Sequence, residues 1–169
     1  MNMKYILAFL LISPIAQAAT VEVCDANGPK HFISQWAEDG DSVYTLSRVD
    51  GVKFSTQEGK IVYSDDLNGD GVKDFIFSSS DSEGSSKDKV YGFLIQCRGY
   101  LKFVGGEYFA GIKVLDASPG GANKYKNIEI YSYQRDKSGG VMYKGKDALT
   151  KSHVWSFNQG AQRYEGESE

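Results

Sequence analysis

The residues with the clearest chemical potential are oxygen-bearing side chains that recur at every second position in one short segment. Residues 66–74 read Asp-Leu-Asn-Gly-Asp-Gly-Val-Lys-Asp, with oxygen-bearing side chains at positions 1, 3, 5 and 9 and glycine at position 6. Calcium takes about six to eight oxygen ligands at about 2.3–2.6 Å. A glycine at the sixth position permits the sharp turn that brings those ligands together. The pattern therefore predicts a calcium-binding loop.

Five residues of this segment are the predicted calcium ligands. They are Asp66, Asn68, Asp70 and Asp74 through their side chains, and Val72 through its backbone carbonyl. Three carboxylates held this close repel one another unless a cation lies among them. The alternative is a polar β-turn, because Asn-Gly and Asp-Gly are also strong hairpin signals. A turn needs only one such dipeptide, so the repeated oxygen spacing favours calcium.

The residues after the loop distinguish it from the helix-flanked EF-hand. Position 12, where an EF-hand loop carries a bidentate Glu, is Phe77, and residues 75–77 read Phe-Ile-Phe, an apolar strand pattern. A D-x-N-x-D-G-x-x-D loop that leads into an apolar strand resembles the calcium loops of FG-GAP and VCBS repeats. The resemblance covers residues 66–77. It implies propeller blades of the kind found in extracellular and periplasmic proteins, with the five residues above as ligands.

The first 18 residues have the features of a secretory signal peptide. Lys4 supplies the positive region, residues 5–12 are apolar, and an Ala-Gln-Ala cleavage site ends at Ala18. The apolar run is too short to span a bilayer. We therefore expect cleavage after Ala18 and a single exported domain of residues 19–169, in the periplasm or secreted from the cell.

The charge of the mature chain limits its partners. Without the signal peptide the chain has 18 basic and 22 acidic residues, a net charge of −4. Nucleic acids and anionic lipids attract basic surfaces, so this balance argues against both as partners. No later segment is apolar enough for membrane insertion. We expect a monomer whose partner is another protein.

Cys24 and Cys97 are the two cysteines of the chain. Cysteines of exported proteins most often pair, and neither residue has a neighbouring His or a C-x-x-C partner. We predict a disulfide bond between them. It would close a long loop and stabilise the fold by roughly 4 kcal/mol through the unfolded chain.

Runs rich in β-branched and aromatic residues cover most of the mature chain. Eleven Tyr and nine Phe residues suit half-buried pleated sheets. The expected strands cover residues 31–36, 43–48, 60–64, 74–78, 91–96, 100–104, 108–115, 127–133, 141–144, 154–157 and 163–164. This pattern predicts an all-β fold of antiparallel sheets.

Evenly spaced glycines between strands indicate an internal repeat. Gly40, Gly99 and Gly160 lie in predicted hairpin turns and are 59 and 61 residues apart. Together with the loop resemblance, this period predicts two to three propeller-blade-like repeats. Closed propellers need about four to eight blades, so we expect an open stack. A β-sandwich is the alternative.

The sequence contains no recognisable catalytic motif. His31 and His153 lack zinc-binding spacing, and no G-x-S-x-G elbow or P-loop occurs. The serines have no evident base to activate them. We therefore predict that the protein is not an enzyme.

Two polar loops, within residues 78–88 and 118–126, are the predicted partner-binding regions. The candidate residues are Ser80, Asp81, Ser82, Glu83, Ser85 and Tyr125. The combined prediction is an exported, calcium-stabilised binding protein, for example an inhibitor or immunity protein directed against a cell-wall hydrolase or toxin. Two alternatives stay open. One is an FG-GAP-like cell-surface adhesion module, and the other is a polysaccharide hydrolase whose two carboxylates sequence alone cannot place.

Overall fold

The computed structural model of the chain describes residues 23–24, 31–39, 42–49, 53–79, 87–116 and 124–167, with the backbone alone over residues 31–58. Within these residues the chain forms thirteen strands and no helix, which confirms the all-β prediction. No helix long and apolar enough to cross a membrane occurs within the described residues. The strands are β1 (His31–Asp39), β2 (Ser42–Val49), β3 (Lys53–Asp65), β4 (Asp74–Ser79), β5 (Lys89–Cys97), β6 (Tyr100–Phe103), β7 (Tyr108–Phe109), β8 (Gly111–Val114), β9 (Ile128–Tyr133), β10 (Tyr143–Lys144), β11 (Asp147–Ala148), β12 (Thr150–Asn158) and β13 (Arg163–Glu165).

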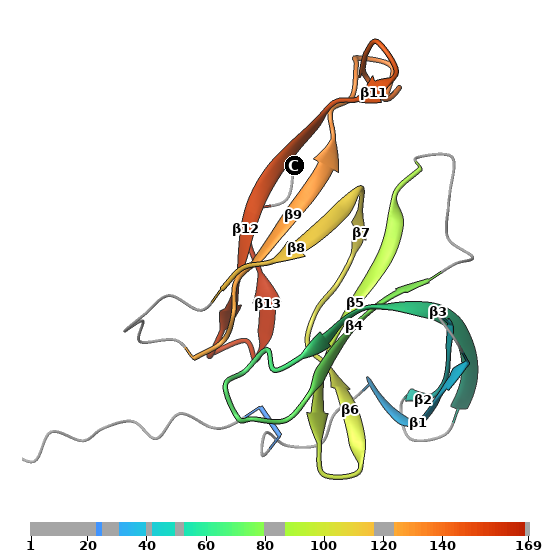
Figure 1. Cartoon of the computed structure of the whole chain (residues 1–169), viewed down its shortest axis with the longest axis vertical. Helices are drawn as coiled ribbons and strands as arrows, with labels where there is room; N and C mark the ends of the chain where they lie inside the picture. The colour runs from blue at the N-terminus through green and yellow to red at the C-terminus, as the bar shows by residue number, and fades with distance from the viewer. Residues whose placement is uncertain are drawn as a thin grey trace, which may run out of the picture.

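Six strands form an antiparallel sheet that closes on itself, in the lower right of Figure 1. β1 to β4 pair in sequence order, β4 pairs with β5, and β5 pairs with β6. β6 then returns to β1 through the pairs Phe32↔Lys102 and Ile33↔Leu101. Each of these six strands therefore has a paired neighbour on both sides over part of its length, which limits the open sheet edge.

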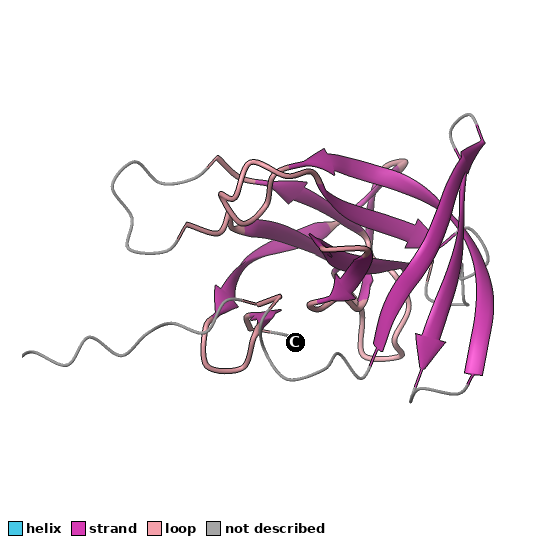
Figure 2. Ribbon diagram, turned by 90° about the horizontal axis from the view of Figure 1, so that it is seen from below, coloured by secondary structure: helices cyan, strands magenta, loops and turns pink. Residues whose placement is uncertain are grey.

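A second sheet of four antiparallel strands lies beside the closed one, in the order β13-β12-β9-β8 (Figure 1). Beyond the paired ends of β9 and β12, the short hairpin of β10 and β11 forms the upper tip of the molecule. Figure 2 shows the strands from below, with loops connecting them. β7 pairs with the first residues of β5 and contacts β9, so it connects the two sheets.

Strands β4 and β5 are buried on both faces, and we call this pair the shared wall. Successive side chains of a strand point to opposite sides of the sheet. Ile76 and Phe93 accordingly belong to the larger core, between the sheets, whereas Phe75 and Leu94 belong to a smaller core on the opposite face. Burial on both faces explains the near-continuous apolar sequence of these strands.

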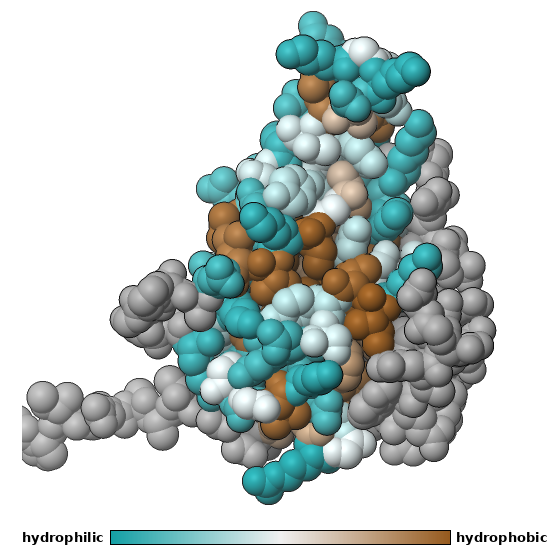
Figure 3. All heavy atoms as spheres, in the orientation of Figure 1, coloured by the Kyte–Doolittle hydropathy of each residue, from teal (hydrophilic) through white to brown (hydrophobic). Residues whose placement is uncertain are grey.

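Aromatic side chains fill the larger core. Phe93 of the shared wall meets Trp155 and Tyr164 of the second sheet edge-to-face, with ring centroids 6.3 and 5.6 Å apart. This geometry places the positive ring edge of one residue against the negative face of the other. In Figure 3 apolar residues gather towards the middle of the visible face, and hydrophilic side chains cover the upper tip.

The predicted repeat is not confirmed by this topology. The turn at Arg98 and Gly99 joins β5 to β6, and Gly160 lies in the turn between β12 and β13, so both hairpin predictions are confirmed. However, the first hairpin belongs to the closed sheet and the second to the four-stranded sheet. Gly40 lies outside the described residues. The two described glycines therefore mark hairpins in different sheets, and nothing in the strand order requires propeller blades.

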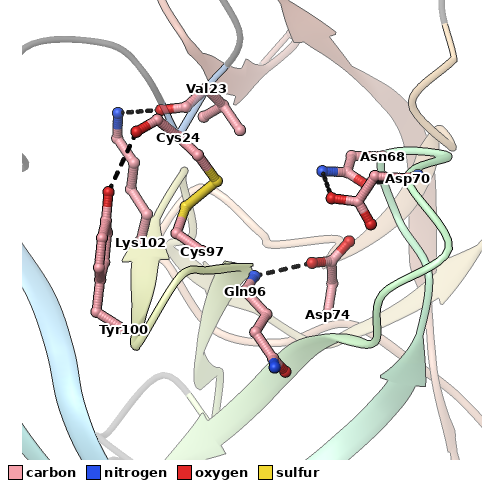
Figure 4. Close-up of a disulfide and its surroundings, with 9 residues drawn as sticks. All are labelled: Val23, Cys24, Asn68, Asp70, Asp74, Gln96, Cys97, Tyr100 and Lys102. Atoms are coloured by element: carbon pink, nitrogen blue, oxygen red, sulfur yellow. Dashed lines mark hydrogen bonds between the residues drawn. A yellow bond between two sulfur atoms is a disulfide. The ribbon is translucent and has the colours of Figure 1, made fainter.

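The predicted disulfide between Cys24 and Cys97 is confirmed, with 5.5 Å between the two Cα atoms (Figure 4). Hydrogen bonds add to this attachment. Lys102 Nζ donates to the carbonyl of Val23 at 2.6 Å, and the Tyr100 hydroxyl donates to the carbonyl of Cys24 at 3.4 Å. Val23 is itself a core residue. Val23 and Cys24 are therefore attached to the hairpin of β5 and β6.

Replacing both cysteines (Cys24→Ser with Cys97→Ser) should lower the free energy of unfolding by about 4 kcal/mol, because the bond closes a long loop in the unfolded chain. The two residues are 73 positions apart. Urea denaturation of the variant and of the reduced wild type measures the effect, and the two should agree. A loss under about 1 kcal/mol would mean that Val23 and the hydrogen bonds of Lys102 and Tyr100 hold the segment unaided.

Candidate metal centre

The predicted calcium loop connects β3 to β4 and is fixed at its base. Leu67 is fully buried in the larger core. Its backbone N–H donates to Asp74 Oδ2 at 2.8 Å, and its carbonyl accepts the N–H of Lys126 at 2.8 Å. The side chain and both backbone groups of Leu67 are thus engaged, so the loop starts from a rigid position.

Two glycines allow the chain to reverse direction within the loop. Gly69 and Gly71 have φ angles of +74° and +82°, in the left-handed region that residues with a Cβ rarely adopt. At Gly69 a Cβ would also come within 3.3 Å of Lys124. Gly71 has open space around it, so its requirement is conformational alone. These positions explain why glycine occupies position 6 of the loop.

The Asp66 carboxylate is held by backbone N–H groups of its own loop. Oδ2 accepts from Gly71 at 2.8 Å, and Oδ1 accepts from Asn68 at 3.0 Å, Gly69 at 2.6 Å and Asp70 at 3.3 Å. Partial burial opposes ionisation of Asp66, but the four hydrogen bonds together hold its pKa below the ordinary value of 3.8. Asp66 is therefore a carboxylate at neutral pH.

Asn68 and Asp70 point towards each other across the loop (Figure 4). Asn68 Nδ2 donates to Asp70 Oδ2 at 2.9 Å, and Asn68 Oδ1 accepts the backbone N–H of Asp70 at 3.1 Å. Asp70 Oδ1 accepts the N–H of Val72 at 2.7 Å. Asn68 is only 3% exposed. The third and fifth loop positions are thereby brought together.

The Asp74 carboxylate joins the loop to the shared wall. Asp74 has no exposed surface, and its Oδ1 accepts the backbone N–H of Gln96 at 2.9 Å while its Oδ2 accepts that of Leu67 (Figure 4). Burial raises its pKa from 3.8 to about 6, against the lowering effect of these hydrogen bonds, and the charges of Asp70 and Asp66 raise it further. The three carboxylates therefore already affect one another electrostatically.

A cation at this loop would depend on mixed oxygen donors. Each carboxylate oxygen has two lone pairs. The oxygens of Asp70 and Asp74 each accept one hydrogen bond within the described residues, so they keep capacity for a ligand bond. Across the described part of the chain, no group of three or more His, Cys, Asp or Glu side chains is placed to hold a metal ion. A cation here would therefore need the Asn68 oxygen and the Val72 carbonyl together with the carboxylates. The full ligand set remains a prediction.

Tyr125, predicted to bind a partner, is a core residue, and that prediction is wrong. It is 5% exposed, and its ring stacks on Phe157 with centroids 3.8 Å apart. Packing of β12 over residue 125 removes it from the surface. The other candidate residues lie outside the described part of the chain, as do the signal peptide and its cleavage site after Ala18; they are Ser80, Asp81, Ser82, Glu83 and Ser85.

Sequence reasoning missed an open pocket of about 190 Å³, lined by residues of β7, β9 and β12 together with neighbouring loop residues. One local signal was available, the consecutive glycines Gly105 and Gly106 just before β7. Such a pair often marks a bend that re-aims the following side chains. The pocket itself depends on strands far apart in sequence.

No family model, curated protein or solved structure matches this chain. The resemblance of residues 66–77 to FG-GAP and VCBS calcium loops rests on the residues of that segment.

In the presence of a chelator, Asp74 should make the fold less stable near pH 7 than near pH 4. Burial raises its pKa to about 6 in the folded chain, above the ordinary value of 3.8 that applies in the unfolded chain. Between these values the folded state holds more protons than the unfolded state, so the free energy of unfolding falls as the pH rises. The contribution is about 3 kcal/mol, at about 1.4 kcal/mol per pKa unit.

Urea denaturation between pH 4 and pH 7 measures this slope. Asp74→Asn should flatten it, whereas Asp116→Asn, at an exposed residue, should leave it unchanged. Asp66 contributes in the opposite sense, and only below pH 3.8, because its pKa is lowered. Equal slopes for the wild type and Asp74→Asn would contradict the assignment.

Proposed function

We propose that this chain is an exported, calcium-stabilised protein that binds another protein and catalyses no reaction. The observation that carries the calcium proposal is the arrangement of residues 66–74, where three acidic side chains and one amide share a single glycine-bent loop. Asp66 and Asp70 already raise the pKa of the buried Asp74. A divalent cation would relieve this repulsion, since an opposite charge nearby favours the ionised form.

The proposed ligands are Asp66, Asn68, Asp70 and Asp74 through side-chain oxygens, and Val72 through its carbonyl. All five are hard oxygen donors, the type that calcium prefers. Water would complete the six to eight ligands that calcium typically takes. A loop with one amide, one carbonyl and acidic groups suits the adaptable coordination of calcium better than the strict octahedron of magnesium.

The proposed role of the ion is structural. The Asp74 carboxylate accepts a hydrogen bond from the backbone N–H of Gln96, which precedes the disulfide-linked Cys97. Leu67 lies in the larger core. Binding energy at the loop would therefore stabilise the junction of β3, β4 and β5. A ligand that binds the folded chain and not the unfolded one raises stability by mass action.

Export is supported by the signal-peptide features of residues 1–18 and by the disulfide, because such bonds persist in oxidising compartments such as the periplasm. A non-catalytic binding role is supported by the sequence, which has no zinc-binding histidine spacing, no G-x-S-x-G elbow and no P-loop. The favoured class is an inhibitor or immunity protein against a cell-wall hydrolase or toxin. An FG-GAP-like adhesion module is the second candidate, favoured by the resemblance of the loop.

Calcium titration of chelator-treated protein tests the metal proposal. Wild type should release or absorb heat at one site, and a calcium concentration 100 times the Kd should stabilise it by about 2.7 kcal/mol. Asp70→Asn keeps the shape of the side chain and should lose most of both effects. The control Asp147→Asn removes the same charge from the exposed β10–β11 hairpin and should behave as wild type. No heat from the wild type would refute the proposal.

A peptidoglycan-lysis assay separates the functional classes. An inhibitor should slow one member of a panel of cell-wall hydrolases and do so with one-to-one stoichiometry. Calcium-dependent adhesion to glycan or matrix, with no effect on any hydrolase, would favour the adhesion module. Turnover of peptidoglycan or another polysaccharide by the chain itself would contradict a non-catalytic role.

A further inference from the structure

The open pocket beside β7 has an apolar floor. Phe109, Ile130 and Trp155 supply it, and each is less than 5% exposed. Phe109 and Trp155 meet edge-to-face, with centroids 5.2 Å apart, so the floor is rigid. At about 190 Å³ the pocket is smaller than the 300–1,000 Å³ typical of small-molecule sites. Its size suits a single long side chain.

The rim of the pocket is negatively charged. Asp88, Glu107, Glu167 and Arg135 all line it. Arg135 Nη2 lies 2.6 Å from Asp88 Oδ2, so these two charges compensate each other. Glu107 and Glu167 are exposed, and neither carboxylate forms an ion pair with a described residue. Among the described residues, the two negative charges at the rim are thus uncompensated.

The backbone holds Glu107 and Tyr108 in fixed positions. Gly105 and Gly106 have φ angles of +134° and +138°, and a Cβ at Gly106 would overlap the carbonyl of Tyr91. The Glu107 carbonyl accepts the N–H of Tyr91 at 3.0 Å. Tyr108 is 61% exposed despite its size. The glycine bend and the pairing of β7 with β5 therefore leave the Tyr108 side chain exposed at the pocket.

The C-terminal side of the rim is also fixed. Trp155 Nε1 donates to the carbonyl of Glu167 at 3.3 Å. Any Cβ at Gly166 would overlap the Trp155 ring, so the chain passes directly against the indole. The Glu167 side chain is consequently presented at the pocket by a backbone in contact with its floor.

We propose that this pocket receives a lysine or arginine side chain of the protein partner. The negative charges of Glu107 and Glu167 attract a cation, and Tyr108 and Tyr133, which also line the pocket, have aromatic rings of the kind that bind cations. The apolar floor suits the aliphatic stem of such a side chain. A neutral sugar would match the aromatic residues but not the charge. This proposal rests on the proposed role in protein binding and names the chemistry of the partner.

The test is an NMR titration of ¹⁵N-labelled full-length mature protein, followed at the Trp155 indole N–H. The probes are the peptides acetyl-Gly-Arg-Gly-amide and acetyl-Gly-Lys-Gly-amide. The controls are the same peptide with norleucine at the central position, as an uncharged match, and N-acetylglucosamine, as a neutral sugar. A Trp36→Phe variant assigns the Trp155 signal. Both cationic peptides should shift it in a saturable manner, and the norleucine peptide should not. Added salt should weaken the binding, since the charges are exposed.

Charge variants locate the binding. Glu107→Gln combined with Glu167→Gln should weaken binding of the arginine peptide about fivefold, the scale expected for two exposed ion pairs. Asp147→Asn removes a charge outside the pocket and should change nothing. Tyr108→Ala should also weaken binding. All these positions are exposed, so unchanged melting temperatures will show that the fold is intact.

Three results would overturn the proposal: no shift with either cationic peptide, an equal shift with the norleucine peptide or N-acetylglucosamine, or unchanged binding by the double variant. Parallel titrations with calcium and with chelator separate it from the proposed function. Binding of the arginine peptide without any calcium heat would refute the metal site and leave this pocket intact. Polysaccharide turnover without peptide binding would refute both the binding role and the pocket.

Discussion

The buried Asp74 carboxylate is the contact on which the arrangement of this region depends. Its two oxygens accept the backbone N–H groups of Leu67 and Gln96, from segments about 30 residues apart in the chain. Loss of such an acceptor leaves a buried donor unpaired, at a cost of about 1–3 kcal/mol. Burial and two neighbouring carboxylates make this group costly to ionise. A nearby cation would therefore favour ionisation of the same carboxylate that orders the loop.

The shared wall of β4 and β5 explains why distant features of the molecule are connected. One face of this wall supports the larger core and the second sheet, and the other supports the smaller core. At the end of β5, Cys97 forms the disulfide with Cys24, and the backbone N–H of the adjacent Gln96 donates to the Asp74 carboxylate of the loop. A change in the disulfide, the loop or either core therefore acts on the same two strands. We expect these features to unfold together, because residues with shared partners are energetically coupled.

Backbone conformation positions the polar groups of both proposed sites. Gly69 and Gly71 bend the candidate metal loop, and Gly105 and Gly106 bend the chain before the pocket. The side chains that follow are displayed by rigid turns rather than by free loops. A site whose geometry is set before binding loses less entropy when the ligand arrives. This favours binding as the common function of the two regions.

Local patterns in the sequence determined the strand content, the hairpins at Gly99 and Gly160, the disulfide and the position of the candidate metal loop. Each depends on neighbouring residue types or on a choice between only two cysteines. Tertiary structure alone decided that β6 closes on β1, that the hairpins lie in different sheets, that Tyr125 is buried and that a pocket forms beside β7. The physical reason is that alternation along a strand fixes which side chains share a face, but not which distant strand or sheet covers that face.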